Sequence, residues 1–155
     1  NTITTTINKL DFKQGGKLLL ENTAGQGTTL GTTFSELKEM MIGLNNPENV
    51  GVCLDTCHLF AFGDYNISDV KEVERMFKDF DCVIGLEKLW LIHLNDSIHP
   101  LKSRRDEHAT LGSGYIWKNG IESLLYLLRK CKKMNIPVVL ETDLSDMVVV
   151  ANLKI

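Results

Sequence analysis

The chain has 155 residues, of which 43% are hydrophobic and 24% charged, and its formal net charge is −3. This length suits one globular unit better than two. No run approaches the roughly 18 apolar residues that a membrane span requires, and the Thr-rich residues 1–8 lack the apolar core of a signal peptide. We therefore expect a soluble, intracellular protein of the cytoplasm or nucleus without a membrane partner. The negative net charge argues against a nucleic-acid partner, since phosphate-binding domains are usually basic.

The four cysteines contain no C-x-x-C pair and do not predict a disulfide framework. Cys53, Cys57, Cys82 and Cys131 are interpreted as small apolar residues in a reducing compartment.

Four short apolar runs are predicted to be strands. They lack two-residue alternation, which is expected of strands buried on both faces of a parallel sheet. In chain order they are Lys17–Leu20, Val50–Leu54, Leu89–Leu94 and Pro137–Leu140.

The segments between these runs have helical spacing. Phe34–Leu44 has Thr33 or Ser35 as a cap, and Val70–Ile84 follows Ser68. The third helix is predicted to start in a capping-box-like way, with Asn119 followed by Glu122, and Val148–Leu153 to begin a last helix. This order predicts an α/β protein with right-handed crossovers.

Four parallel strands alternating with helices are half of a (β/α)₈ TIM barrel. We treat residues 1–155 as a single unit of this kind. A half-barrel sheet leaves two unpaired edges, so we expect either a missing N-terminal half or self-association to cover them.

Each predicted strand runs into a residue type that binds metal: Glu21, Asp55, His93 or Glu141. The carboxyl ends of parallel strands lie on one rim of the sheet. A single such residue is more simply a solvated strand end or a helix cap. Four gathered together would repel or desolvate one another unless cations lay among them.

Two closely spaced pairs extend this set. Asp55 and His58 are three residues apart in a predicted loop, and Asp106 and His108 are two apart, which places both side chains on one side of an extended segment. Carboxylate and imidazole ligands together suit Zn²⁺, with Mn²⁺ and Fe²⁺ as alternatives.

Three neighbouring polar residues are less decisive. His99 precedes Pro100 and is predicted to be merely exposed. Asn95 and Asp96 are interpreted either as partners that orient His93 or as a plain polar strand exit.

The basic residues Lys102, Arg104 and Arg105 stand directly before Asp106. They are the best candidates for DNA phosphate contacts, although a solvated basic loop is an equal alternative. If four carboxylates bind metal, the rest of the chain carries −3 + 4 = +1, which weakens the charge objection to nucleic acid. The glycines of Ala24–Gly27 and Gly112–Gly114 would let backbone approach metal or DNA closely, or form plain tight turns.

Five sequence blocks together resemble the consecutive signatures of the endonuclease IV family, apurinic/apyrimidinic endonuclease family 2, in its C-terminal half. They run across almost the whole chain: Glu21-Asn22-Thr23-Ala24-Gly25-Gln26-Gly27, Val52-Cys53-Leu54-Asp55-Thr56-Cys57-His58, His93-Leu94-Asn95-Asp96-Ser97, Asp106-Glu107-His108 with Gly112-Ser113-Gly114, and Leu140-Glu141-Thr142.

The resemblance implies a (β/α)₈ barrel with three zinc ions, of which this chain would be strands 5–8. It implies that Glu21 bridges the first and second zinc ions. It also implies that Asp55, His93 and Glu141 are the remaining ligands of the second ion. Glu21 and Glu141 are then the catalytic carboxylates. The third ion would be held by His58, Asp106 and His108. The first ion needs two histidines from earlier strands that precede Asn1, so we expect about two zinc ions from this chain's ligands.

The implied activity is that of a zinc-dependent endonuclease of DNA base excision repair, which hydrolyses the phosphodiester 5′ to abasic sites and leaves a 3′-hydroxyl. The chain alone is predicted to be inactive or very slow. Glu107 and Ser113 depart from the family pattern, where arginine and an acidic residue are common.

Two alternatives remain. A xylose isomerase-like sugar isomerase would use one or two ions and no separate cluster of His58, Asp106 and His108. A non-catalytic half-barrel would serve as a metal-binding or DNA-binding module or as an assembly partner.

Overall fold

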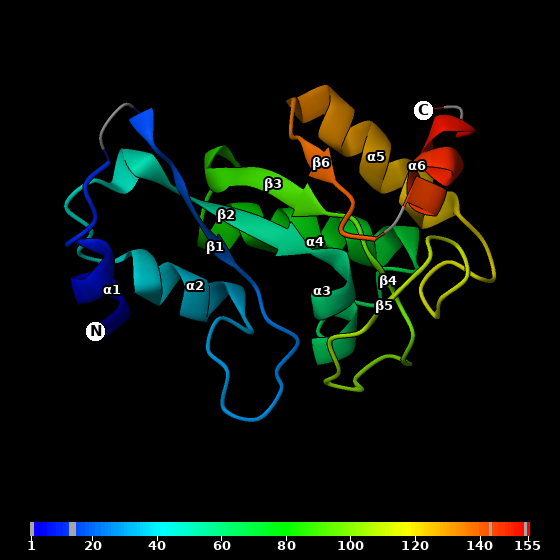
Figure 1. Ribbon diagram of the computed structural model, residues 1–155, viewed down its shortest axis with the longest axis horizontal. Coiled ribbons are helices and arrows are strands. Elements are labelled where there is room, and N and C mark those ends of the chain that lie inside the picture. Colours follow the sequence, from blue (N-terminus) through cyan, green and yellow to red (C-terminus); the bar gives the residue numbers. More distant parts are fainter. Residues whose placement is uncertain (1, 13–14, 143, 154) are drawn as a thin grey trace.

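The computed structural model describes residues 2–12, 15–142, 144–153 and 155. Within these residues the main sheet has four parallel strands in the order β1–β2–β3–β6, and β4 pairs with β5 in a separate antiparallel sheet (Figure 1). The strands are β1 (Leu18–Glu21), β2 (Val50–Asp55), β3 (Leu89–His93), β4 (Asp96–Ser97), β5 (His108–Ala109) and β6 (Val138–Val139). The helices are α1 (Thr2–Ile7), α2 (Phe34–Met41), α3 (Thr56–Phe62), α4 (Val70–Val83), α5 (Glu122–Met134) and α6 (Leu144–Ala151). The predicted alternation of parallel strands with helices is confirmed.

The hydrophobic core lies between the main sheet and the helices α2, α4 and α5. Val52 and Leu54 of β2 pack there with Phe80 of α4 and Leu124 of α5, all fully buried. Because side chains alternate along a strand, Cys53 and Asp55 project from the opposite face of β2. Apolar packing therefore holds one face of the sheet, and polar groups collect at the carboxyl end of the other.

Burial on both faces was predicted for all four strands, but it holds only for β2. All six residues of β2 are buried, whereas every residue of β1 is half-buried and Val139 of β6 is exposed. The reason is their place in the sheet, because β1 and β6 are its edges. The expectation of two open edges is confirmed for the described part of the chain.

The helix starts were predicted with mixed success. Thr33 caps α2 as expected, and its hydroxyl accepts a hydrogen bond from Glu36 N at 3.2 Å. The cap of α4 is Asp69 rather than Ser68. The capping box predicted for α5 is wrong: a turn with Gly120 N bonded to Trp117 O separates Asn119 from the helix, which begins only at Glu122.

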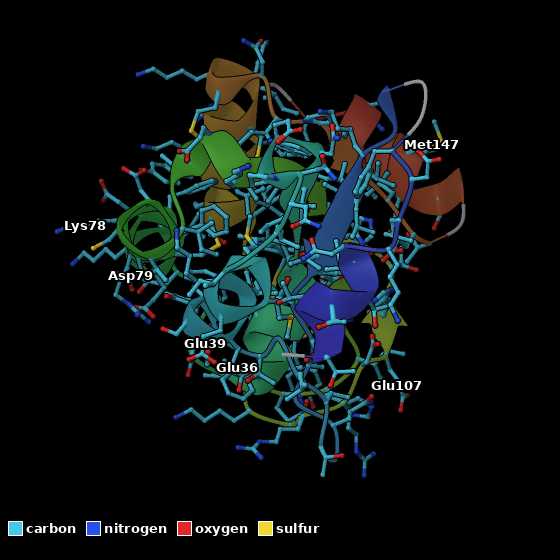
Figure 2. All side chains as sticks on the ribbon, turned by 90° about the vertical axis from the view of Figure 1, so that its left-hand side faces the viewer. Glu36, Glu39, Lys78, Asp79, Glu107 and Met147 are labelled. Carbon is cyan, nitrogen blue, oxygen red and sulfur yellow. The ribbon has the colours of Figure 1, made fainter. Side chains whose placement is uncertain are left out.

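Other differences concern short elements. The last helix begins at Leu144, four residues before the predicted start, and α1 and the β4–β5 hairpin were not predicted. The longest helix in the described residues, α4, has 14 residues, and no helix among them has the length and apolar character to cross a bilayer. Figure 2 shows Lys78 and Asp79 of α4 on the outside of the molecule, as expected for a helix that covers the sheet.

Candidate metal centre

The strand ends predicted to bind metal do meet at one rim of the sheet. The parallel register places Glu21 beside Cys53 and Asp55 beside His93. Glu141 follows β6, which pairs with β3 through His93 and Val139. One ligand atom from each of Glu21, Asp55, His93 and Glu141 lies within 4.8 Å of the others. We call these four residues the first cluster.

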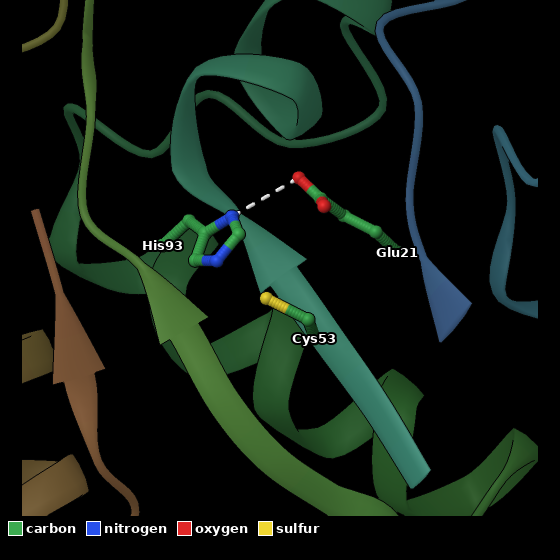
Figure 3. A group of neighbouring side chains, drawn as sticks. All are labelled: Glu21, Cys53 and His93. Atoms are coloured by element: carbon green, nitrogen blue, oxygen red, sulfur yellow. Dashed lines mark hydrogen bonds and ion pairs between the residues drawn. The ribbon is translucent and has the colours of Figure 1, made fainter. Parts of the chain in front are cut away.

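His93 is at the centre of the first cluster. Its Nδ1 lies 3.2 Å from Glu21 Oε1 and 3.2 Å from Glu141 Oε2. Figure 3 shows Glu21 and His93 facing each other, with the thiol of Cys53 beside them. Burial, with a smaller contribution from Glu21, raises the pKa of Cys53 to about 12, so this thiol is protonated at neutral pH. The interpretation of Cys53 as a small apolar residue is consistent with its burial.

His58, Asp106 and His108 form the second cluster, again with ligand atoms within 4.8 Å of one another. Asp106 Oδ1 lies 2.9 Å from His58 Nε2 and 3.2 Å from His108 Nε2. The two clusters adjoin, since Glu21 Oε1 is 3.5 Å from His58 Nδ1 and Asp55 Oδ2 is 3.9 Å from His108 Nε2. The sequence-based division into a group of four and a group of three therefore matches the spatial grouping.

The segment that carries His58 is a helix and not the predicted loop. Asp55 caps α3, and its Oδ1 accepts a hydrogen bond from His58 N at 2.8 Å. The loop prediction failed because Thr56–Phe62 is short and buried almost throughout, so it lacks the polar face that marks a surface helix. One turn of α3 presents Asp55 to the first cluster and His58 to the second.

The other two members of the second cluster come from the β4–β5 hairpin. Ser97 of β4 pairs with His108 of β5, and Asp106 lies two residues before His108. Only His108 of this pair is in a strand, but the side chains of both residues approach His58, as the prediction of one shared side requires.

The imidazoles of the second cluster have the chemistry of metal ligands. His58 Nδ1 is 2.8 Å from the carbonyl oxygen of Asn22, which can only accept, so Nδ1 carries the proton and Nε2 has the lone pair. The Nε2 atoms of His58 and His108 are buried and lack an aligned hydrogen bond, although Asp106 Oδ1 is close to both. Lone pairs facing a carboxylate repel unless a proton or a cation lies between them, and two imidazoles with one carboxylate suit Zn²⁺.

The two clusters perturb the titration of their own members. Burial raises the pKa of Asp55 above its usual value. Burial also lowers the pKa of His58, but the charges of Asp55 and Asp106 and the bond to Asn22 raise it, and the net shift is upward. Both shifts make the protonated form of these two side chains more favourable than it is in water.

Two buried asparagines contact the first cluster: Asn95 bridges the carboxylates of Asp55 and Glu141, and Asn22 bonds the backbone of Asp55. Asn95 Nδ2 lies 2.5 Å from Asp55 Oδ2 and 2.9 Å from Glu141 Oε2, while Asn22 bonds the backbone N–H and carbonyl of Asp55. The suggestion that Asn95 or Asp96 orients His93 is wrong for Asn95, whose amide points to the two carboxylates. Sequence reasoning missed Asn22, although the Glu-Asn start of its block was a signal.

His99 was predicted to be merely exposed, but its side chain is only 19% exposed and its Nε2 lies 3.2 Å from Glu107 Oε1. The turn after β4 folds back, because the Ser97 hydroxyl donates to His99 O at 3.0 Å, and this brings His99 against the hairpin.

The candidate phosphate contacts lie on an exposed loop beside the second cluster. Lys102, Arg104 and Arg105 are all exposed. The backbone N–H of Lys102 bonds Phe60 O at 3.2 Å, and that of Arg104 bonds Ala61 O at 2.9 Å. The last turn of α3 therefore braces this loop, and Lys102 and Arg104 adopt the left-handed φ values of 66° and 53°.

Parallel strands, outer helices and a carboxylate and imidazole site at the carboxyl rim define a protein of the TIM-barrel class. The chain belongs to the family of xylose isomerase-like TIM barrels, whose model matches residues 4–146.

Its relatives confirm the resemblance to endonuclease IV. A probable endonuclease 4 of Chlorobium phaeovibrioides is 44% identical over 128 residues, which cover 83% of this chain and 44% of the relative. That of Halothermothrix orenii is 43% identical over 145 residues, or 92% and 50% of the two chains. The crystal structure of endonuclease IV from Thermus thermophilus superposes with a TM-score of 0.72 at 33% identity and covers 86% of this chain and 47% of that one. The chain thus spans about half the length of these relatives.

Proposed function

We propose that this chain is the metal-binding half of a zinc-dependent apurinic/apyrimidinic endonuclease of DNA base excision repair, which hydrolyses the phosphodiester 5′ to abasic sites. The observation that carries the proposal is the convergence of seven side chains into two adjoining clusters at the carboxyl rim. The similarity to proteins named probable endonuclease 4 supports it.

In this proposal Glu21, Asp55, His93 and Glu141 hold one zinc ion, and the second cluster holds another. Glu21 is shared with a further ion, whose remaining ligands would come from the part of the relatives' length that this chain does not span. Bound zinc would supply Lewis-acid polarisation of the phosphoryl oxygens and acidify water for attack at neutral pH.

The residues of this chain would prepare that chemistry by fixing the ligands in place. Asn95 aims two carboxylates of the first cluster at one point, and the Asn22 carbonyl keeps the Nδ1 proton on His58, so that Nε2 faces Asp106. Supporting contacts of this kind set the orientation and basicity of metal ligands.

The loop that carries Lys102, Arg104 and Arg105, which α3 braces, is the proposed DNA contact. Backbone in the left-handed region costs roughly 1–3 kcal/mol per residue and persists where the surroundings over-determine it. Its bonds to α3 hold Lys102 and Arg104 close to Asp106, and together with Arg105 they would bind phosphates flanking the lesion. Glu107 adds a negative charge at this surface, where its Oε1 lies 3.2 Å from His99 Nε2.

The proposal includes a partner for the open sheet. The edges β1 and β6 would pair with the other half of a complete barrel, or with a second copy of this chain. The 155-residue chain by itself would then be inactive or very slow.

The test is nicking of a duplex that contains one abasic site, by this chain alone and with the part of a full-length relative that this chain does not span supplied in trans. We expect zinc-dependent incision 5′ to the site only in the mixture. The incision should be lost in His58→Ala and kept in the matched surface variant Ser113→Ala. Robust turnover by the chain alone would refute the dependence on a partner, and a mixture without incision would favour a non-catalytic module.

A further inference from the structure

Asp96 has a fully buried carboxylate that no residue of either cluster contacts through a side chain. Four backbone N–H groups donate to it. Oδ1 accepts from Ser97 at 2.8 Å and from Ile116 at 2.9 Å, and Oδ2 accepts from Gly112 and Gly114 at 3.0 Å each. Three of these donors belong to the turn that follows β5, so one carboxylate gathers that turn against β4.

The same turn was expected either to bring backbone close to metal or DNA or to be a plain tight turn, and it wraps around Asp96. Tyr115 N bonds Ser97 O at 2.7 Å and closes the turn. Gly114 has no room for a side chain, since a Cβ there would lie 2.5 Å from Asp96 Oδ1. Gly114 is thus explained by its close approach to Asp96 and to the backbone of β4, whereas Gly112 adopts the left-handed φ of 81°, which favours glycine.

This arrangement bears on the second cluster because of where its members lie. His58 is on α3, whereas His108 is on β5, which leads into the turn held by Asp96, and Asp106 lies two residues before that strand. Residues 104–107 before β5 are exposed and have no place in the core. The position of Asp106 and His108 therefore depends on the loop before them, which α3 braces through Arg104 N, and on the short hairpin with the anchor behind it.

We propose that Asp96 is a positioning residue of the second cluster: its carboxylate fixes the turn at residues 110–116 and so holds Asp106 and His108 opposite His58. The proposal rests on the proposed function, in that it takes the second cluster to bind a divalent cation. The turn keeps a second anchor, since Leu111 N donates to the buried Asp146 at 2.7 Å, and a variant of Asp96 should therefore retain its fold.

The test is zinc titration of the 155-residue chain against a chromophoric chelator, with circular dichroism as a check on folding. The wild-type chain should bind two zinc ions, and His108→Ala should identify the second site by losing one. Asp96→Asn puts an amide donor against backbone donors, so we expect the second site to weaken about 10- to 100-fold while the first changes less than about threefold. Gly114→Ala should also weaken the second site, because its Cβ would meet both the Asp96 carboxylate and Ser97 O and would separate the turn from β4.

Ser113→Ala is the matched control, because its hydroxyl bonds only Thr110 O, and it should bind zinc like the wild type. The proposal is overturned if a folded Asp96→Asn or Gly114→Ala chain keeps wild-type affinity at the second site, or if both sites weaken equally. If Asp96→Asn does not fold, Gly114→Ala decides by the same criteria. A wild-type chain that binds no zinc would instead refute the proposed function.

Discussion

Replacement of Asn95 by alanine tests whether this residue orients the metal ligands or only contributes to the stability of the fold. The substitution removes the amide that bridges Asp55 and Glu141. The bond to buried Asp55 contributes about 1.5–3 kcal/mol, as hydrogen bonds to charged groups do. Glu141 is 37% exposed, so water replaces its lost donor at little cost. We expect the metal-free chain to lose about 2 kcal/mol, or roughly 4–8 °C in Tm for a chain of this length.

The matched variant is Asn22→Ala. Asn22 is also buried and also contacts residue 55, but through the Asp55 backbone N–H at 2.7 Å and carbonyl at 3.3 Å. Two neutral hydrogen bonds contribute about 1 kcal/mol each, so its loss of stability should be similar. Zinc affinity of the first cluster should fall about 10- to 100-fold in Asn95→Ala and less than about threefold in Asn22→Ala.

The assay is thermal unfolding of both metal-free variants together with zinc competition titrations. Equal losses of zinc affinity would refute the reasoning, because the effect would then follow stability and not the orientation of the carboxylates. Unchanged zinc affinity in Asn95→Ala would refute it as well.

Three further outcomes are expected. Glu36 is slightly buried, which raises its pKa, but donors from Thr32 and nearby backbone lower it more, so its folded pKa lies below the usual 4.5. Glu36→Gln should therefore cost about 1 kcal/mol of unfolding free energy at pH 7, and the difference from the wild type should vanish as the pH falls through and below 4.5 in urea titrations. Trp117→Phe removes a buried bond of 3.0 Å from Nε1 to the Ser123 hydroxyl and should cost about 1–3 kcal/mol by urea unfolding; a loss below 0.5 kcal/mol would contradict this. EDTA treatment of the zinc-loaded chain should lower its Tm, since ligand at a thousandfold excess over Kd stabilises by about 4 kcal/mol per site, and an unchanged Tm would mean that no zinc had been bound.

The main features of the sheet and of the site could be predicted from the sequence because each depends on local pattern. Val50–Leu54 is apolar without interruption and forms most of β2, an inner strand whose residues are all buried. The residue after such a run lies at the carboxyl rim in any parallel sheet, which is why Asp55 and Glu141 were identified without coordinates. Asp106 and His108 were assigned to one site because they are two residues apart, and side chains two apart in an extended segment lie on the same side.

What could not be predicted depends on contacts distant in the chain. The short helix α3 is buried on all sides, so its apolar residues have no helical period that could be detected. His99 becomes half-buried only because the hairpin brings Glu107 to it. The four donors on Asp96 come from residues up to 20 positions away, and no local pattern indicates that a buried carboxylate is the centre of a glycine-rich turn. Whether the edge strands β1 and β6 are exposed depends on what packs against them, and a local sequence pattern does not indicate this.

Anomalous diffraction at the zinc absorption edge, from crystals of the zinc-loaded chain, tests the central claim most directly. We predict one peak among Glu21, Asp55, His93 and Glu141 and a second among His58, Asp106 and His108. Zinc bound elsewhere on the surface, with both of these sites free of anomalous density, would contradict it.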